Sequence, residues 1–410
     1  MTTAVEDHVT GPGAADAKRW LDQHGFPTGR EEPWRYAPVD DIRHRLDSLS
    51  QTSAPPMEMG GDDLDRLAGR HGAIQIVFVD GVLASTLSSI EELPGLRFGT
   101  ARELSQAMRQ RLVPAGDPPD GFEALNRASS GDAAYLFVAD GVELSETVHV
   151  IHVSTGARVA HPRLVVEVGA GSRLDLVETY VGAAGGGLTN ASTTAHLAVG
   201  AHLGLHRVQD EQPDAVHVGR LAVVQQHGSQ SEVTVLSHGA SISRLSTAVG
   251  LNEETASCRI TGLLAPLPHA RHDDLATVDH AASRCTSDLV VRAVVPEHAR
   301  ATSSGHVIVR PGTAGSVVQQ RSDAILLDPT AQADSRPWLE ILADDVRANH
   351  GSATGRLDDD ALFYLRSRGI GRDEARSVLV GAFARAIVEQ VEPLSLRAQI
   401  AQWFGWEADT

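Results

Sequence analysis

Lysine is nearly absent from this chain of 410 residues: Lys18 is the only one, and arginine supplies the remaining basic charge. A P-loop needs a lysine inside its glycine-rich turn, so the sequence holds no Walker A site and is not an ATPase of that type. The same shortage leaves Lys18 as the single possible Schiff-base lysine. It stands in a polar segment near Trp20, which does not favour a pyridoxal enzyme.

Cysteine is also scarce, with Cys258 and Cys285 far apart and in no C-x-x-C arrangement. A disulfide framework is implausible at this chain length, and the reducing cytosol is the natural environment. Each thiol, taken alone, is predicted to be a small buried side chain.

Basic residues number 35 against 53 acidic ones, which gives a net charge of −18. Nucleic acids and anionic membranes are both bound through clusters of Lys and Arg, so the composition disfavours both partners. No apolar run approaches the ~20 residues of a membrane span, and residues 1–10 lack the basic and apolar regions of a signal peptide. We therefore expect a cytoplasmic protein with no nucleic-acid and no membrane partner.

Short β-branched stretches are what the chain has in abundance, recurring from about residue 134 for about two hundred residues without helical periodicity. Gly-Ala turns separate some of them, at Gly169, Gly200 and Gly239. Their spacings of ~31 and ~39 residues are compatible with the coils of a solenoid, although a β-sandwich fits as well. Glycine at such corners allows backbone angles that other residues resist.

Helical patterns flank this β-rich region. On its N-terminal side, residues 14–24 predict a helix, and Asp80-Gly81 between apolar stretches predicts a hairpin. On its C-terminal side, residues 358–360 are three aspartates that suit a helix start, and Gly369 suits the position after a helix. Residues 372–391 then repeat apolar side chains on one helix face.

The most specific motif lies near the end of the chain. An extended apolar stretch from Leu339 runs into Asn349-His350-Gly351, and a helical hairpin over Leu357–Ile370 follows at once. This block closely resembles the C-terminal signature of the SufB/SufD family, the scaffold subunits of the Suf iron–sulfur cluster assembly machinery. The segment Arg30–Tyr36 also resembles the Arg-x-Glu-x-Trp-x-Tyr segment of the D-type branch of that family.

The resemblance implies a mainly β fold with a right-handed parallel β-helix core at residues 129–345. An N-terminal helical or mixed domain is expected at 1–128 and a C-terminal helical domain at 346–410. The implied function is that of a non-catalytic scaffold that pairs with a SufB-like subunit and docks a SufC-like ATPase. A transient iron–sulfur cluster would form at the interface of the two scaffold chains, with no cofactor tightly bound by this chain alone. Two cysteines cannot supply the usual four cluster ligands, so further ligands must come from another chain.

The resemblance also assigns candidate residues. His350 falls on the position implicated in holding the nascent cluster, and imidazole is a competent iron ligand. Many family members have cysteine two residues earlier; here that residue is Ala348, so His350 must act without it. The expected ATPase-binding element is the tight turn of the helical hairpin, formed by Leu365, Arg366, Arg368, Gly369 and Ile370. Without the resemblance, His350 would more simply cap a turn.

Two other classes of function stay open. β-helices also host polysaccharide lyases and hydrolases, for which the adjacent acids Asp273-Asp274 and Asp344-Asp345 are candidates. The chain also has a dense histidine set that comprises His196, His202, His206, His217, His227 and His238, followed by His269, His272 and His280. A histidine-metal enzyme would use the histidines of residues 196–238. Of these, His202 and His206 would share one strand face, but no Cys/His spacing matches a known metal motif. His280 resembles half of a family motif whose second half, a Pro-His pair, is missing.

Overall fold

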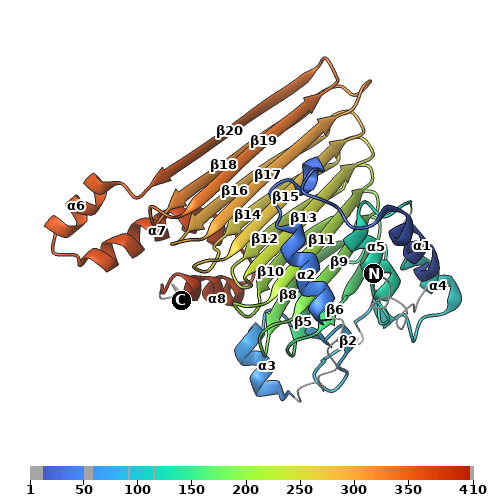
Figure 1. Ribbon diagram of the computed structural model, residues 1–410. Helices are drawn as coiled ribbons and strands as arrows, with labels where there is room; N and C mark the ends of the chain where they lie inside the picture. The colour runs from blue at the N-terminus through green and yellow to red at the C-terminus, as the bar shows by residue number, and fades with distance from the viewer. Residues whose placement is uncertain (1–12, 50–58, 91–92, 114–115, 407–410) are drawn as a thin grey trace.

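The computed structural model describes residues 13–49, 59–90, 93–113 and 116–406. Its core is a parallel β-helix of about eight turns, in which two ten-stranded sheets face each other (Figure 1). The mainly β, helix-flanked fold expected from the sequence is thus confirmed. The expectation about a signal peptide at residues 1–10 lies outside the described residues.

Sheet A contains, in spatial order, β2 (Val82–Leu83), β1 (Ile74–Val79), β5 (Val148–Ser154), β8 (Arg173–Gly182), β10 (His202–Asp210), β12 (Gln230–Ser237), β14 (Ser257–Leu264), β16 (Thr286–Val295), β18 (Ser316–Leu326) and β20 (Val346–Arg356). Sheet B contains β19 (Gln332–Ile341), β17 (Arg300–Val309), β15 (Arg271–His280), β13 (Ile242–Leu251), β11 (Val216–Gln225), β9 (Leu188–Leu197), β7 (Arg163–Val168), β4 (Ala134–Val138) and β3 (Leu96–Thr100), with β6 (Val159–Ala160) beside β9. Neighbours are parallel except in the β1–β2 hairpin, which turns at the predicted Asp80-Gly81, and in the β3–β4 pair.

Apolar side chains that point into the lumen hold the coils together. On sheet A, the inward residues Leu176, Leu205, Val233 and Ile260 stand in register on successive coils, 27 to 29 residues apart. They belong to one core cluster that fills the lumen from both sheets. A single coil cannot bury its own apolar face, so each coil is stabilised by the next.

One corner of the β-helix requires a left-handed backbone. Its residues have positive φ and donate backbone N–H groups to the next coil at 2.7–3.3 Å; they are Gly141, Gly171, Gly200, Gly228, Thr255, Arg284 and Gly315. Glycine takes five of the seven positions because it adopts positive φ without a steric penalty. The Gly-Ala turn at Gly200 lies at this corner, whereas Gly239 lies at the opposite one, between β12 and β13.

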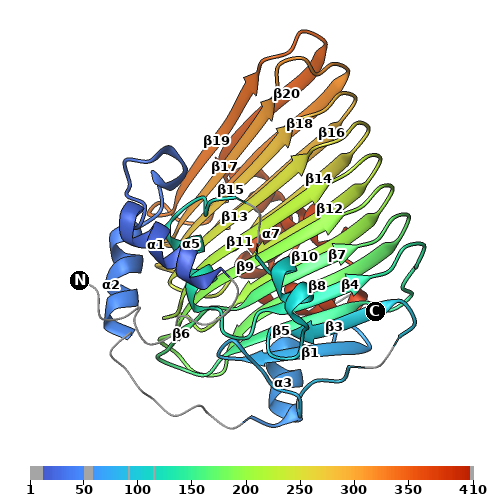
Figure 2. The same ribbon diagram turned by 90° about the vertical axis from the view of Figure 1, so that its right-hand side faces the viewer.

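Helices cover the outer faces of both sheets (Figures 1 and 2). The outer face of sheet B carries α1 (Ala14–His24), η1 (Glu32–Trp34), α2 (Val39–Leu49), α4 (Gln106–Arg111) and α5 (Gly121–Ser129). The outer face of sheet A carries α3 (Gly61–Ala68), α7 (Arg372–Val388) and α8 (Leu394–Trp403), while α6 (Asp359–Ser367) buries none of its residues. Within the described residues, no helix is both long and apolar enough to cross a membrane.

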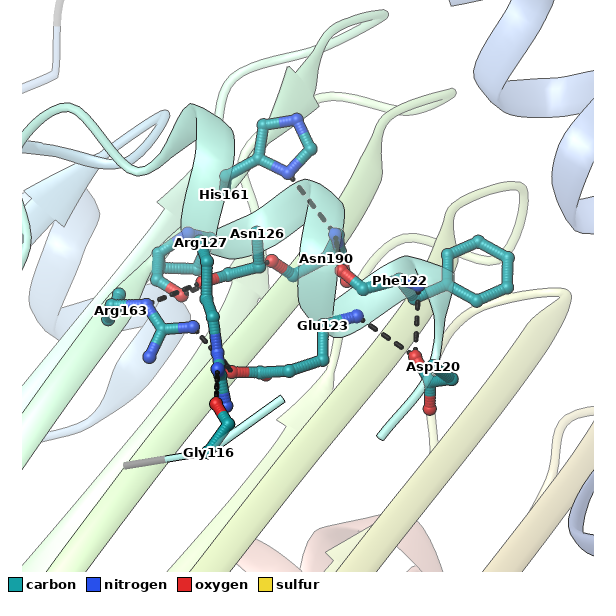
Figure 3. Close-up of polar contacts among 10 residues, drawn as sticks. Gly116, Asp120, Phe122, Glu123, Asn126, Arg127, His161, Arg163 and Asn190 are labelled. Atoms are coloured by element: carbon teal, nitrogen blue, oxygen red, sulfur yellow. Dashed lines mark hydrogen bonds and ion pairs between the residues drawn. The ribbon is translucent and has the colours of Figure 1, made fainter. Parts of the chain in front are cut away.

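A buried polar network fixes α5 to sheet B (Figure 3). Glu123 accepts hydrogen bonds from Arg163 at 2.6 Å and from Arg127 at 2.9 Å. The Asn126 amide donates to the backbone oxygen of Asn190 at 2.6 Å. Burial alone would raise the pKa of Glu123, but the two arginines outweigh it and lower this pKa to about 2.

The Arg30–Tyr36 segment is an aromatic anchor between the N-terminal helices and the core. Trp34 is buried with its ring 4.9 Å from the Arg244 guanidinium, which also donates to the Pro33 oxygen at 2.6 Å. Glu32 forms an ion pair with Arg336 on β19. The anchor therefore reaches the last coil of the β-helix.

Both sheets extend beyond residues 129–345, where we expected the β-rich core. Strands β1, β2 and β3 precede this range, and β20 follows it. The first three strands are short and interrupted by turns, which in sequence favours a separate mixed domain. β20 is an edge strand with one neighbouring strand, β18, and most of its residues are exposed. It holds mainly polar residues and glycine, and therefore lacks the apolar alternation by which a buried strand is found in a sequence.

The lumen also contains a buried ion pair, between Glu178 on β8 and Arg207 on β10, with Arg207 donating at 2.8 and 3.0 Å. Thr193 donates to the same carboxylate at 2.6 Å. Burial alone would raise the pKa of Glu178, but the Arg207 charge, with His152 and Thr193, holds it well below its usual range. The pair therefore stabilises the fold at neutral pH, and this contribution is lost on acidification.

We expect Arg207→Met to lower the free energy of unfolding at neutral pH by about 3–5 kcal/mol, because it leaves a buried carboxylate unpaired. The deficit should shrink at lower pH, where the unpaired Glu178 takes up a proton. Urea unfolding at two pH values measures both effects. Arg173→Met, which breaks the half-exposed Arg173–Asp175 pair on β8, should cost less than about 1 kcal/mol. Equal losses in the two variants would contradict the prediction.

Candidate functional site

The last coil leaves both sheets with a free edge. β20 pairs with β18 and β19 pairs with β17, and no other described strand borders either one (Figure 1). Large apolar side chains gather at this end of the β-helix, where Trp338, Ile341 and Leu342 are exposed. A free strand edge presents unpaired backbone N–H and C=O groups, so this open end has the properties of a protein–protein interface.

His350 lies in the middle of β20, in register with Gln320 of β18. The two residues end an inward column of sheet A that is otherwise apolar, formed by Ile74, Val148, Leu176, Leu205, Val233, Ile260 and Leu289. His350 therefore stands at the mouth of the lumen on the free edge. The sequence predicts His350 at the junction of the β-rich core and the C-terminal helices, whereas the histidine lies within the last strand of sheet A.

The His350 imidazole is available for binding. The side chain is exposed and makes no hydrogen bond or ion pair with any described residue. Ala348, two residues earlier on the same face, packs against the core cluster and offers only a methyl group. Of the inward positions of β20, His350 carries the one side chain that is an ordinary iron ligand.

The C-terminal hairpin presents a second exposed feature. The N-cap Asp358 accepts backbone hydrogen bonds from Asp360 and Ala361, and the stop at Gly369 has positive φ, both as predicted. Of the five residues proposed for ATPase binding, Arg366, Arg368 and Gly369 are exposed, while Leu365 and Ile370 are half-buried.

Sequence reasoning missed two large side chains on α6, Phe363 and Tyr364, which are its most exposed apolar groups. Figure 1 shows α6 standing away from the β-helix. A signal was present, because aromatic residues make up only 4% of the chain and here two are adjacent. An aromatic pair on a projecting helix suits an anchor for a partner.

The base of this projection is fixed. Val380, Ile387 and other apolar residues of α7 and α8 pack on the outer face of sheet A. Trp403 donates to Asp210 at 3.0 Å, and His71 lies 2.7 Å from the Gln399 side-chain oxygen. The helix α8 and the second half of α7 are therefore part of the body, and α6 projects from it together with the start of α7 (Figure 1).

The dense histidine set does not form one site. His202 and His206 share the outer face of β10, as predicted, whereas His217 and His272 point into the lumen. There His217 lies 2.7 Å from Glu211, and His272 lies 2.9 Å from Ser237. Across the described residues, no three His, Cys, Asp or Glu side chains gather where they could hold a metal ion.

The other candidates are dispersed as well. Asp273 points outward to Arg244 at 3.3 Å, while Asp274 points into the lumen, where burial raises its pKa to about 7. The two carboxylates thus cannot act on one substrate in a groove. Cys258 and Cys285 are free and buried, as predicted, and burial raises the pKa of both thiols. His280 is buried against Ser287, at 2.8 Å.

Comparison with known proteins gives a consistent picture. Residues 150–383 match a family model described as the SufBD core domain of SUF-system FeS cluster assembly. The chain is 26% identical to the iron–sulfur cluster assembly protein SufD of Escherichia coli, over 96% of this chain and 92% of that protein. It is 25% identical to an iron–sulfur cluster assembly SufBD family protein of Synechocystis, over 98% and 92% of the two chains. It is also 25% identical to the chloroplastic protein ABCI7 of Arabidopsis thaliana, over 91% and 81%.

Proposed function

Because this chain belongs to the SufB/SufD family of iron–sulfur cluster assembly proteins and is SufD-like, we propose that it is the D-type scaffold subunit of a Suf complex. It pairs with a B-type subunit at the open end of its β-helix and docks a C-type ATPase through α6. The nascent iron–sulfur cluster is the cargo of the complex, formed between the two scaffold chains. In this proposal the chain supplies a ligand and half of an interface, and carries no turnover site of its own.

The observation that carries the proposal is the position of His350. Its imidazole, a side chain that can ligate iron, lies on a free strand edge at the mouth of an apolar lumen, exposed and without a hydrogen-bond or ion-pair partner among the described residues. A second β-helix that continued the two sheets across this edge would cover the imidazole and bring its own ligands beside it. This chain's two thiols cannot complete the set, because both are buried.

The link between α6 and β20 supports a mechanical role for ATP. β20 ends at Arg356 and α6 begins at Asp359, so two residues separate the strand that carries His350 from the projecting helix. Dimerisation of two ATPases, one on each scaffold chain, would pull on α6. Because α7 and α8 are fixed to sheet A, the displacement would act on the edge strand and expose or release the cluster ligands.

Co-expression with the B- and C-type subunits and anaerobic purification tests the proposal. We expect a stable complex that contains iron and acid-labile sulfide, whereas this chain purified alone should retain neither in stoichiometric amount. If no complex forms with either subunit, the D-type scaffold function is wrong.

Leu342→Asp should weaken binding of the B-type subunit by at least about tenfold, because it places a charge in the exposed apolar patch at the open end. Leu342 is 49% exposed, so the isolated chain should fold normally. Val199→Asp is the matched control: Val199 is 48% exposed but lies at a corner far along the β-helix. Affinities from biolayer interferometry should change only for Leu342→Asp. A similar change for both variants would place the interface elsewhere.

A further inference from the structure

Gln320 is an unusual occupant of its column. Each of the seven inward positions before it on sheet A holds Ile, Val or Leu, and the next position is His350. The Gln320 side chain is only 6% exposed, yet its Oε1 has no hydrogen-bond partner among the described residues. An unpaired buried amide oxygen destabilises the fold, because it has lost its hydrogen bonds to water. A leucine would continue the column without that cost.

The amide of Gln320 crosses the lumen to the opposite sheet. A Cβ atom added at Gly305 of β17 would lie 1.8 Å from Gln320 Nε2, so the amide fills the space that the glycine leaves. Leu289, one coil earlier, packs against the same position. Gly305 and Leu289 thus hold the Gln320 side chain beneath the open end of the lumen, where its oxygen has no partner.

His350 is the residue paired with Gln320 on the next strand, toward the open end. The two residues are paired in register on adjacent parallel strands and point to the same face. Adjacent strands lie about 4.8 Å apart, which lets an amide and an imidazole on paired positions form a hydrogen bond. An amide can accept from an imidazole N–H or donate to an imidazole nitrogen, so it can fix either tautomer.

We infer that Gln320 is a positioning residue for His350: once a partner covers the open end, its amide oxygen accepts a hydrogen bond from one ring N–H of His350 and so directs the unprotonated ring nitrogen toward the cluster. This inference rests on the proposed function of His350. Metal-ligating histidines generally donate the N–H of their other ring nitrogen to a neighbouring group, and this hydrogen bond sets the tautomer and the ring orientation. Gln320 would be that neighbouring group for His350.

Three variants test the inference in the anaerobically purified complex. Gln320→Met keeps the shape of the side chain and removes its hydrogen-bonding groups. Gln320→Glu keeps an acceptor, and Gln319→Met changes the adjacent residue, which points outward and is exposed. Gln320→Met should fold and assemble normally, because the column is otherwise apolar. We expect its iron and sulfide content to fall about tenfold, with Gln320→Glu and Gln319→Met within twofold of the unaltered complex.

A spectroscopic readout separates positioning from a merely structural role. In the dithionite-reduced complex, pulsed electron paramagnetic resonance should show imidazole nitrogen couplings for the unaltered protein and for Gln320→Glu, and altered couplings for the residual cluster of Gln320→Met. Unchanged cluster content and unchanged couplings in Gln320→Met would overturn the inference. If His350→Ala also retains the cluster, the ligand role of His350 has failed; if only His350→Ala loses it, the inference about Gln320 alone has failed.

Discussion

Phe363→Asp is expected to remove the C-type ATPase from the purified complex while the B-type subunit stays bound. Phe363 is 72% exposed on a helix that buries none of its own residues, so the substitution removes an aromatic anchor without disturbing the fold. Loss of such an anchor typically costs about 2–4 kcal/mol, which corresponds to roughly 30- to 700-fold weaker binding. Co-purification from cells shows whether the ATPase stays bound, and titration with the purified ATPase measures the loss of affinity.

Leu394→Asp is the matched control for this prediction. Leu394 is 65% exposed at the start of α8, so its substitution introduces the same charge on a comparable apolar side chain elsewhere in the C-terminal helices. Point substitutions are preferable to deletion of residues 358–410, because that deletion would uncover the outer face of sheet A on which α7 and α8 pack. Normal ATPase binding by Phe363→Asp would show that α6 is not the docking element.

His350→Ala is expected to abolish the cluster in the complex co-purified anaerobically with both partners. The imidazole is exposed and makes no hydrogen bond or ion pair with any described residue, so folding and assembly should be unchanged. If the cluster depends on this ligand, iron and acid-labile sulfide should fall to background. Colorimetric iron and sulfide assays on equal amounts of complex provide the measurement.

Asn349→Ala controls for a general effect on β20. Asn349 is the adjacent residue on the same exposed strand, and its side chain points to the opposite face. It should leave the cluster content unchanged. If the complexes of His350→Ala and of the unaltered chain contain equal amounts of cluster, His350 is not a cluster ligand. The chain's membership of the SufB/SufD family does not depend on this result.

The sequence predicted more of the fold than of the site. β-branched stretches and Gly-Ala turns fitted a solenoid or a sandwich, and the family resemblance decided for the β-helix. Gly169 and Gly200 do lie at the same corner on successive coils, but the coil between equivalent positions, Gly171 and Gly200, is 29 residues long. The ~39-residue spacing to Gly239 does not correspond to a coil, because Gly239 belongs to the opposite corner. Thr255 and Arg284 take positive φ at the same corner as Gly200, so no simple glycine repeat exists for a sequence search to find.

The candidate site, too, could be predicted from the sequence only in part. The family resemblance identified His350 and the hairpin around Gly369, but Gln320, Leu342 and Phe363 emerged only from the structure. Exposure of Phe363 follows from α6 having no sheet beneath it, which helical periodicity cannot reveal. Gln320 is thirty residues from His350 in sequence, and their pairing depends on the length of a complete coil.

By itself, the sequence determined the alternation of inward and outward side chains, the absence of a Walker A lysine and the family motif, because these are local properties of the chain. Only the tertiary structure decided which residues of successive coils stand together, as Arg207 does over Glu178 and His350 over Gln320. The physical reason is that the length of each coil sets the register between neighbouring strands. Coils of 27 to 31 residues differ in the length of their corners, and a slip of one residue would turn every side chain of a strand to the other face.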